Sequence, residues 1–262
     1  MMKTMRKSLW ICMILLVLVE GGVMGAVKEE PVSGTGWVLS EKEVKDLERK
    51  AEGGDIEAIW CLFNYYTVGF ENSKKALFWA RKGARLGDAK LRYNLGLDLV
   101  NSDDPKEKAE GVAALKESAN QNYTLAQKTL AHRYEQGRGV RKNLLQAEKW
   151  FRKAAIQGNR IAMVEVVRLM AARARDIATL SEAYGWTLLA LKRTPSWVRQ
   201  PFIDKVRLAQ WDILTKAKGF GADEKQFISR SEEWARKQDV NIPMTDPEDV
   251  NESFCKYLNK ER

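Results

Sequence analysis

Residues 126–158 read AQKTLAHRYEQGRGVRKNLLQAEKWFRKAAIQG, two helix-forming stretches joined by a glycine-rich turn. In the first stretch Ala126, Leu130 and Tyr134 recur every four residues, so they share one face of a helix. Gly137 and Gly139 end that helix, because glycine enters left-handed backbone at low cost. The second stretch has an inner face of small and aromatic residues, namely Ala147, Trp150, Phe151, Ala154 and Ala155. The stretch therefore predicts two helices packed side by side.

The same pattern occurs four times along the chain, at spacings of 33, 35 and 36 residues. The unit boundaries align at Gly54, Gly87, Asn122 and Gly158. The first helices open with the aligned residues Ala58, Leu91, Ala126 and Ala162, and the second helices align at Trp79, Ala114, Trp150 and Trp186. Self-similarity at this period is typical of stacked helix pairs, because each pair buries its apolar face only against a neighbour. We therefore predict an all-α fold, a right-handed α-solenoid of stacked antiparallel helix pairs with helical caps, in which residues 54–194 form four repeats.

The unit at residues 126–158 resembles the Sel-one-like repeat, a relative of the tetratricopeptide repeat. The features that carry the resemblance are Ala126, Leu130-Ala131, Tyr134, Gly137-Arg138-Gly139-Val140, Ala147, Trp150-Phe151, Ala154-Ala155 and Gly158. The first unit lacks the Gly-x-Gly turn, the second has Asn101-Ser102-Asp103-Asp104-Pro105 in its place, and the fourth is degenerate. The resemblance implies a protein that assembles or regulates other proteins.

The segments outside the repeats have their own expected roles. Residues 1–26 have the layout of a signal peptide, with Lys3, Arg6 and Lys7 before an apolar run over residues 9–19. We expect cleavage near Gly25 or Ala26 and export to the periplasm or beyond, with an uncleaved anchor as the alternative. Residues 27–53 are predicted to be a flexible lead-in and a capping helix that begins with the capping box of Ser40 and Glu43. Residues 195–240 are predicted to form capping helices, and residues 241–262 a flexible tail.

Two cysteines, Cys61 and Cys255, remain after removal of the leader. In an oxidising compartment they could form a disulfide. Cys61 lies in a predicted repeat helix and Cys255 in a polar tail, and this placement favours two free thiols. Both alternatives stay open.

The chain has a formal net charge of +9, and its basic residues are spread through the repeats. Such a surface favours acidic proteins, an anionic envelope polymer or a membrane surface, although a merely solvated basic face fits the composition too. We expect no nucleic-acid partner, because the chain is predicted to be exported.

The inventory of catalytic residues is small. His132 is the only histidine, which excludes metal sites built on paired histidines. The sequence has no Gly-x-Ser-x-Gly turn, no phosphate-binding glycine loop and no His-Glu-x-x-His motif. We therefore expect no enzymatic activity, no metal and no cofactor.

The first helices of the repeats are expected to line the concave side of the stack. Counted from the opening residue of each, offsets 0, 4 and 8 belong to the core, while offsets 3, 6 and 7 lie on another face. The predicted partner-binding residues on that face are Tyr65, Asn94, Asp98, Thr129, His132, Arg133, Glu165 and Arg168. Their mixture of aromatic, polar and charged side chains suits a protein or extended peptide partner bound by a monomer. The alternative is that these positions are tolerated surface.

The sequence therefore favours an exported scaffold for protein–protein interaction. The alternatives are a regulator of cell-envelope or wall enzymes that engages anionic polymer, and a secreted host-directed factor. Salt separates the first two, because binding by a basic surface weakens more steeply with ionic strength.

Overall fold

The computed structural model describes residues 39–69, 72–195, 198 and 200–242. Within them the chain forms eleven α-helices, one π-helical turn and no strand. The elements are α1 (Glu41–Glu52), α2 (Ile56–Asn64), η1 (Tyr65–Gly69), α3 (Ser73–Arg85), α4 (Ala89–Leu99), α5 (Pro105–Asn120), α6 (Thr124–Gln136), α7 (Leu144–Ile156), α8 (Arg160–Arg173), α9 (Ile177–Lys192), α10 (Gln200–Gly219) and α11 (Glu224–Asp239). The expected signal peptide and nearly all of the expected lead-in and tail lie outside the described residues.

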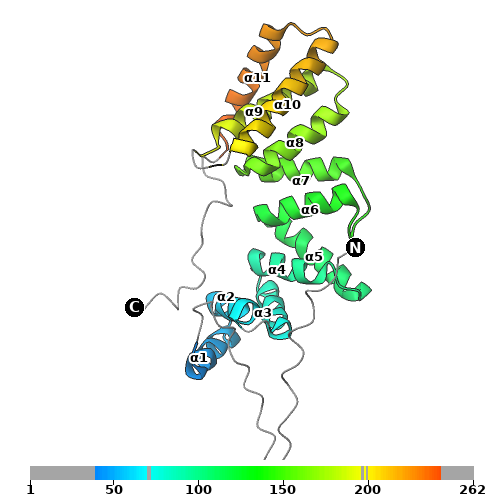
Figure 1. Ribbon diagram of the computed structural model, residues 1–262. Coiled ribbons are helices and arrows are strands. Elements are labelled where there is room, and N and C mark those ends of the chain that lie inside the picture. Colours follow the sequence, from blue (N-terminus) through cyan, green and yellow to red (C-terminus); the bar gives the residue numbers. More distant parts are fainter. Residues whose placement is uncertain (1–38, 70–71, 196–197, 199, 243–262) are drawn as a thin grey trace, which may run out of the picture. The chain divides into compact units, whose positions relative to one another are not determined.

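The helices pack in chain order, as Figure 1 shows by their colours. The first helices of the four repeats, α2, α4, α6 and α8, are called A helices here, and α3, α5, α7 and α9 are called B helices. Each A helix packs against its own B helix, and each of the first three B helices packs against the next A helix. Helix α1 packs on α2, while α10 and α11 pack on α9. The fold is an all-α solenoid, as the repeat spacing predicts.

The four aligned boundary residues share one backbone conformation. Gly54, Gly87, Asn122 and Gly158 have φ angles of 90°, 97°, 64° and 93°. This left-handed conformation turns the chain from the preceding helix, which is α1, α3, α5 or α7, into the next A helix. Asparagine is among the few residues other than glycine that tolerate it. The four positions are therefore regularly spaced because the same left-handed turn precedes the A helix of each repeat.

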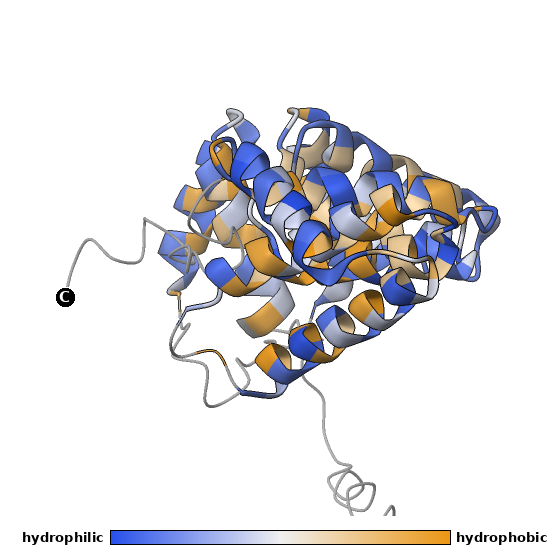
Figure 2. Ribbon diagram, turned by 90° about the horizontal axis from the view of Figure 1, so that it is seen from above, coloured by the Kyte–Doolittle hydropathy of each residue, from blue (hydrophilic) through white to orange (hydrophobic). Residues whose placement is uncertain are grey.

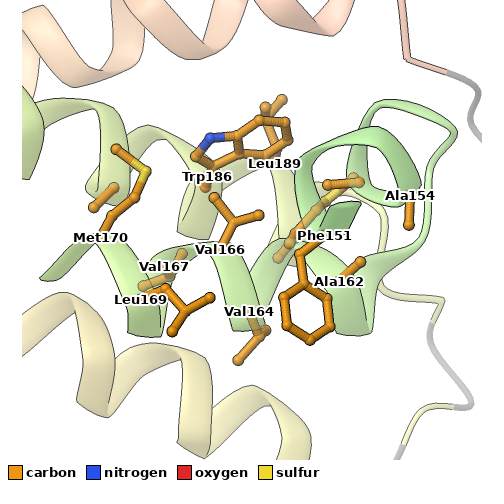
Figure 3. Packing of buried hydrophobic residues seen from close by; sticks show 14 of the residues in the cluster. Phe151, Ala154, Ala162, Val164, Val166, Val167, Leu169, Met170, Trp186 and Leu189 are labelled. Carbon is orange, nitrogen blue, oxygen red and sulfur yellow. The ribbon is translucent and has the colours of Figure 1, made fainter. Parts of the chain in front are cut away.

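The apolar columns predicted from the sequence form the core. The residues at offsets 0, 4 and 8 of the A helices are buried, apart from the half-buried Tyr134. The tryptophans of the B helices are buried too, and Figure 3 shows Val166 of α8 pointing toward Trp186 of α9. The buried side chains form two clusters, one over α1–α5 and one from the end of α5 to Ile242.

Figure 2 shows hydrophobic and hydrophilic residues interspersed along the helices. Inner helices pack on more than one neighbour, as α9 does on α8, α10 and α11. Helix α1 begins at the predicted capping box: the Ser40 side chain accepts from the Glu43 backbone, and the Glu43 carboxylate accepts from the Ser40 backbone at 2.7 Å. In the described part of the chain, no helix combines the length and the apolar character that crossing a bilayer requires.

Helices α4 and α5 approach each other more closely than a side chain at their contact would allow. A Cβ atom on Gly111 of α5 would lie 2.5 Å from the backbone nitrogen of Val100 and 2.8 Å from the carbonyl carbon of Leu99. A Cβ atom on Gly96 of α4 would lie 2.6 Å from Leu115. The two glycines therefore set the distance between the helices of the second repeat.

Candidate functional site

The structure places seven of the eight predicted partner-binding residues on accessible parts of three A helices. Asn94 and Asp98 lie on α4, Thr129, His132 and Arg133 on α6, and Glu165 and Arg168 on α8. Each of these seven side chains is at least partly exposed. We call the surface formed by these seven residues the A-helix face. Whether it binds a partner stays a prediction.

Tyr65 does not lie on this face. Its side chain is 6% exposed, and its ring packs edge-on against that of Tyr66 with 5.1 Å between the centroids. Cys61, one turn earlier, is also buried. The expectation that offsets 3 and 7 lie on an accessible face is therefore wrong for the first repeat, and it is also wrong for Leu169, at offset 7 of the fourth repeat, which is 6% exposed. Cys61 lies in the regular part of α2, and both Cys61 and Tyr65 belong to the buried cluster that α2 forms with α1 and α3, so tertiary packing covers this side of the helix in the first repeat.

Polar contacts join each A helix of this face to the next. From α6, Arg133 donates through Nη1 to Oδ1 of Asn101, at the end of α4, at 3.1 Å. From α8, Arg168 pairs with Glu135 of α6 and donates through Nε to Oε2 of Glu165 at 2.8 Å. Asn101 and Glu135 are residues that the sequence reasoning missed. Their signal is a separation of 32 and 33 residues from their partners, close to one repeat.

His132 is held in place rather than free. Its Nδ1 lies 3.4 Å from Oε2 of Glu135, and its ring packs edge-on against the buried ring of Phe151 at 4.8 Å. Both contacts direct the imidazole ring toward its own repeat. No group of His, Cys, Asp and Glu in the described residues has the arrangement of a metal site.

Asp98 and Arg133 are the two charges of the A-helix face that carry no opposite charge in the described part of the chain. They occupy the same offset in consecutive repeats. Asp98 reaches solvent, yet the surrounding walls desolvate its carboxyl and raise its pKa. Burial lowers the pKa of the Arg133 guanidinium, and the charge of Arg138 lowers it further. Arg168 differs, because its hydrogen bonds to Glu165 and Glu135 outweigh its burial and raise its pKa.

A cleft of about 560 Å³ lies beside Asp98. Its walls come from η1, α3, α4 and the start of α5, with residues that include Tyr66, Thr67, Leu77, Asp98, Ser102 and Glu107. The carboxylate of Asp98, which has no partner among the described residues, thus lines a cavity between the first and second repeats.

Cys61 is disulfide-bonded, so the interpretation of Cys61 as a free thiol is wrong. The other two cysteines of the chain, Cys12 and Cys255, lie outside the described residues.

The Sel1 repeat model matches residues 65–88 and 124–159, which fall in the first and third repeats. No curated protein matches the chain. A solved structure of a protective antigen present in uropathogenic Escherichia coli strains, which displays an SLR fold, matches with a TM-score of 0.54 and 26% identity. That match covers 76% of this chain and 44% of the antigen, so the chain spans less than half of its length.

A Sel1 repeat protein from Oxalobacter formigenes matches with a TM-score of 0.42 and 28% identity, over 48% of this chain and 97% of that structure. Sel1 repeat proteins are in general scaffolds for protein–protein interaction rather than catalysts. The two matched repeats, the helix-pair architecture and the SLR-fold relative all agree. The first and third repeats therefore match the Sel1 repeat, and the chain has the helix-pair fold of an SLR-fold relative.

Proposed function

We propose that this protein is an exported scaffold that binds an extended segment of a partner protein along the A-helix face. The observation that carries the proposal is the pair of uncompensated charges, Asp98 and Arg133. A partly desolvated charge without a partner is unfavourable in the free protein, and an opposite charge on a ligand relieves that penalty. The two charges have opposite signs, so they favour a segment that carries both a basic and an acidic group.

Consecutive A helices come within side-chain reach of each other on this face, because Arg168 of α8 pairs with Glu135 of α6. An extended segment that lies across the A helices can therefore meet residues of successive repeats. Asn94 and Thr129 lie on the same face and offer further hydrogen-bonding groups to such a segment.

The proposal predicts a large effect of Arg133→Glu on peptide binding. Extended peptides are first selected from a displayed random library against the wild-type protein, and their affinities are measured by calorimetry. We expect Arg133→Glu to weaken binding at least about tenfold, which is about 1.4 kcal/mol. Lys149→Glu is the matched control, because it makes the same charge change on the exposed surface of α7 in the same repeat. Equal losses in both variants would contradict binding at the A-helix face.

The net charge of +9 favours a second candidate function, in which a basic surface engages an anionic envelope polymer or membrane surface. The same binding assay at rising salt separates the two. Screening strongly weakens interactions of exposed charges but affects a partly buried pair less. A steep loss of binding with salt, shared by Arg133→Glu and Lys149→Glu, would favour the anionic surface.

Export is part of the proposal. Its supports are the signal-like residues 1–26 and the disulfide at Cys61, since disulfides persist in oxidising compartments. The similar antigen is a protective antigen of a pathogen, which agrees with an exported protein and with the host-directed alternative. We expect N-terminal sequencing of the native protein to start near residue 26 or 27. A native protein that retains Met1 would argue against cleavage.

A further inference from the structure

The cleft beside Asp98 exists because two repeats differ in one turn. In the third repeat the chain between α6 and α7 is seven residues long (137–143) and folds back on the second repeat. A Cβ atom on Gly139 of this turn would lie 3.2 Å from Cγ2 of Val112 and 3.5 Å from Cγ2 of Val100. The turn of the third repeat therefore covers the second.

The second repeat offers no such cover to the first. Its turn between α4 and α5 has five residues (100–104) and contains no glycine. Ser102 donates through Oγ to Oε2 of Glu107 at 2.6 Å, and this bond holds the turn against α5. The positions equivalent to Val100 and Val112 are Thr67 and Leu77, and both line the cleft. The cavity therefore corresponds to the space on the second repeat that the longer turn of the third repeat (137–143) fills.

The chemistry of the cleft selects a cation with an apolar stem. Tyr66, Leu77 and Leu99 supply apolar wall, and Asp98 supplies a carboxylate that no described residue pairs with. Glu107, the other carboxylate of the cleft, is already engaged by Ser102 and lies 3.8 Å from Nη2 of Arg81. Lys74 is the only basic residue among the cleft-lining residues of the described chain. An anionic group would meet two carboxylates, and a metal ion would find only one free ligand.

We propose that this cleft is the subsite for a single basic side chain, a lysine or arginine, of the extended segment bound by the protein. The apolar stem of that side chain packs against Leu77 and Tyr66, and its charged head meets Asp98. The inference rests on the proposed function and adds the chemical identity of one ligand residue. A run of several basic residues is disfavoured, because the remainder of the chain carries a strong positive charge.

The test uses synthetic variants of the peptides selected from the displayed library. Each position is replaced in turn by Lys, Arg, Gln, Glu and Met, and the set is bound to wild-type protein, Asp98→Asn and Asp98→Glu. We expect wild type to require Lys or Arg at one position, with about a tenfold loss on replacement by Gln. Asp98→Asn should bind the Lys and Gln peptides equally, and Asp98→Glu should restore the preference. Asp103→Asn is the matched control, since Asp103 is exposed in the same turn and does not line the cleft.

The variant Asp98→Asn is expected to fold, because the carboxylate has no partner among the described residues. The substitution also removes the free-energy cost of desolvating a charge. Its unfolding transition checks this. A basic preference that survives in Asp98→Asn, or wild-type binding with no basic preference, would overturn the subsite while leaving the A-helix face in place. Selection that yields no binding peptide at all would instead contradict the proposed function, and the subsite with it.

Discussion

Replacing Gly111 with valine is expected to lower the free energy of unfolding by about 3 kcal/mol. Gly111 lies in the middle of α5, where a Cβ atom would stand 2.5 Å from the backbone nitrogen of Val100. A clash with backbone cannot be relieved by rotating a side chain, so α4 and α5 must separate. That movement opens the contact between the two helices of the second repeat and the packing of Leu115 against Gly96.

Urea denaturation followed by circular dichroism measures this loss. Gly219→Val is the control, because a Cβ atom at the end of α10 would have no neighbour within 4 Å. That variant should stay within about 0.5 kcal/mol of wild type. A Gly111→Val protein as stable as the Gly219→Val protein would mean that α4 and α5 are not in such close contact.

Replacing Glu148 with alanine is the second substitution with a large expected effect on stability. Glu148 of α7 is 6% exposed and accepts hydrogen bonds from Arg173 of α8, at 2.7 Å and 2.9 Å, and from Arg152, at 3.0 Å. Removing the carboxylate leaves two guanidinium groups beside each other without this acceptor. Breaking a buried pair costs about 3–5 kcal/mol, and the partial exposure of both arginines reduces that to about 2–3 kcal/mol.

The effect of Glu148→Ala should depend on pH. Burial alone would raise the pKa of Glu148, but the hydrogen bonds from Arg173 and Arg152 outweigh burial and lower it. A lowered pKa in the folded state means that this stabilisation is complete above the unfolded-state pKa. It is lost as pH falls through the folded-state value. The difference in unfolding free energy between wild type and Glu148→Ala should therefore shrink at acid pH. A difference that is equal at pH 7 and about pH 3 would contradict an electrostatic origin.

The fold was predictable because its determinants repeat. The apolar residues at offsets 0, 4 and 8, together with the boundary column that ends at Gly158, are visible as periodic positions. Their physical roles, burial and a left-handed turn, are the same in each unit. The role of Gly111 could not be predicted in this way, because it depends on the close contact of α5 with the end of α4, which no repeated position in the sequence indicates.

The site was predictable only in part. Asp98 and Arg133 follow from the helical offsets, and the structure adds that neither meets an opposite charge within the described residues. The burial of Tyr65 was not predictable, because it depends on the packing of α2 against α1 and α3 in the core of the first repeat and not on a helical offset. The cleft was also missed. The cleft depends on how two turns of different length pack on the preceding repeat, and no pattern in the sequence shows that packing.

Photo-cross-linking tests the central claim, binding at the A-helix face, most directly. A photoreactive benzoylphenylalanine replaces Thr129 on α6, or Lys149 on the exposed surface of α7 in the same repeat. Each protein is irradiated with a peptide selected from the library, and the products are identified by mass spectrometry. We predict that the peptide cross-links from position 129 and not from position 149. Cross-linking from position 149 alone would show that the partner binds the B helices and would contradict the account.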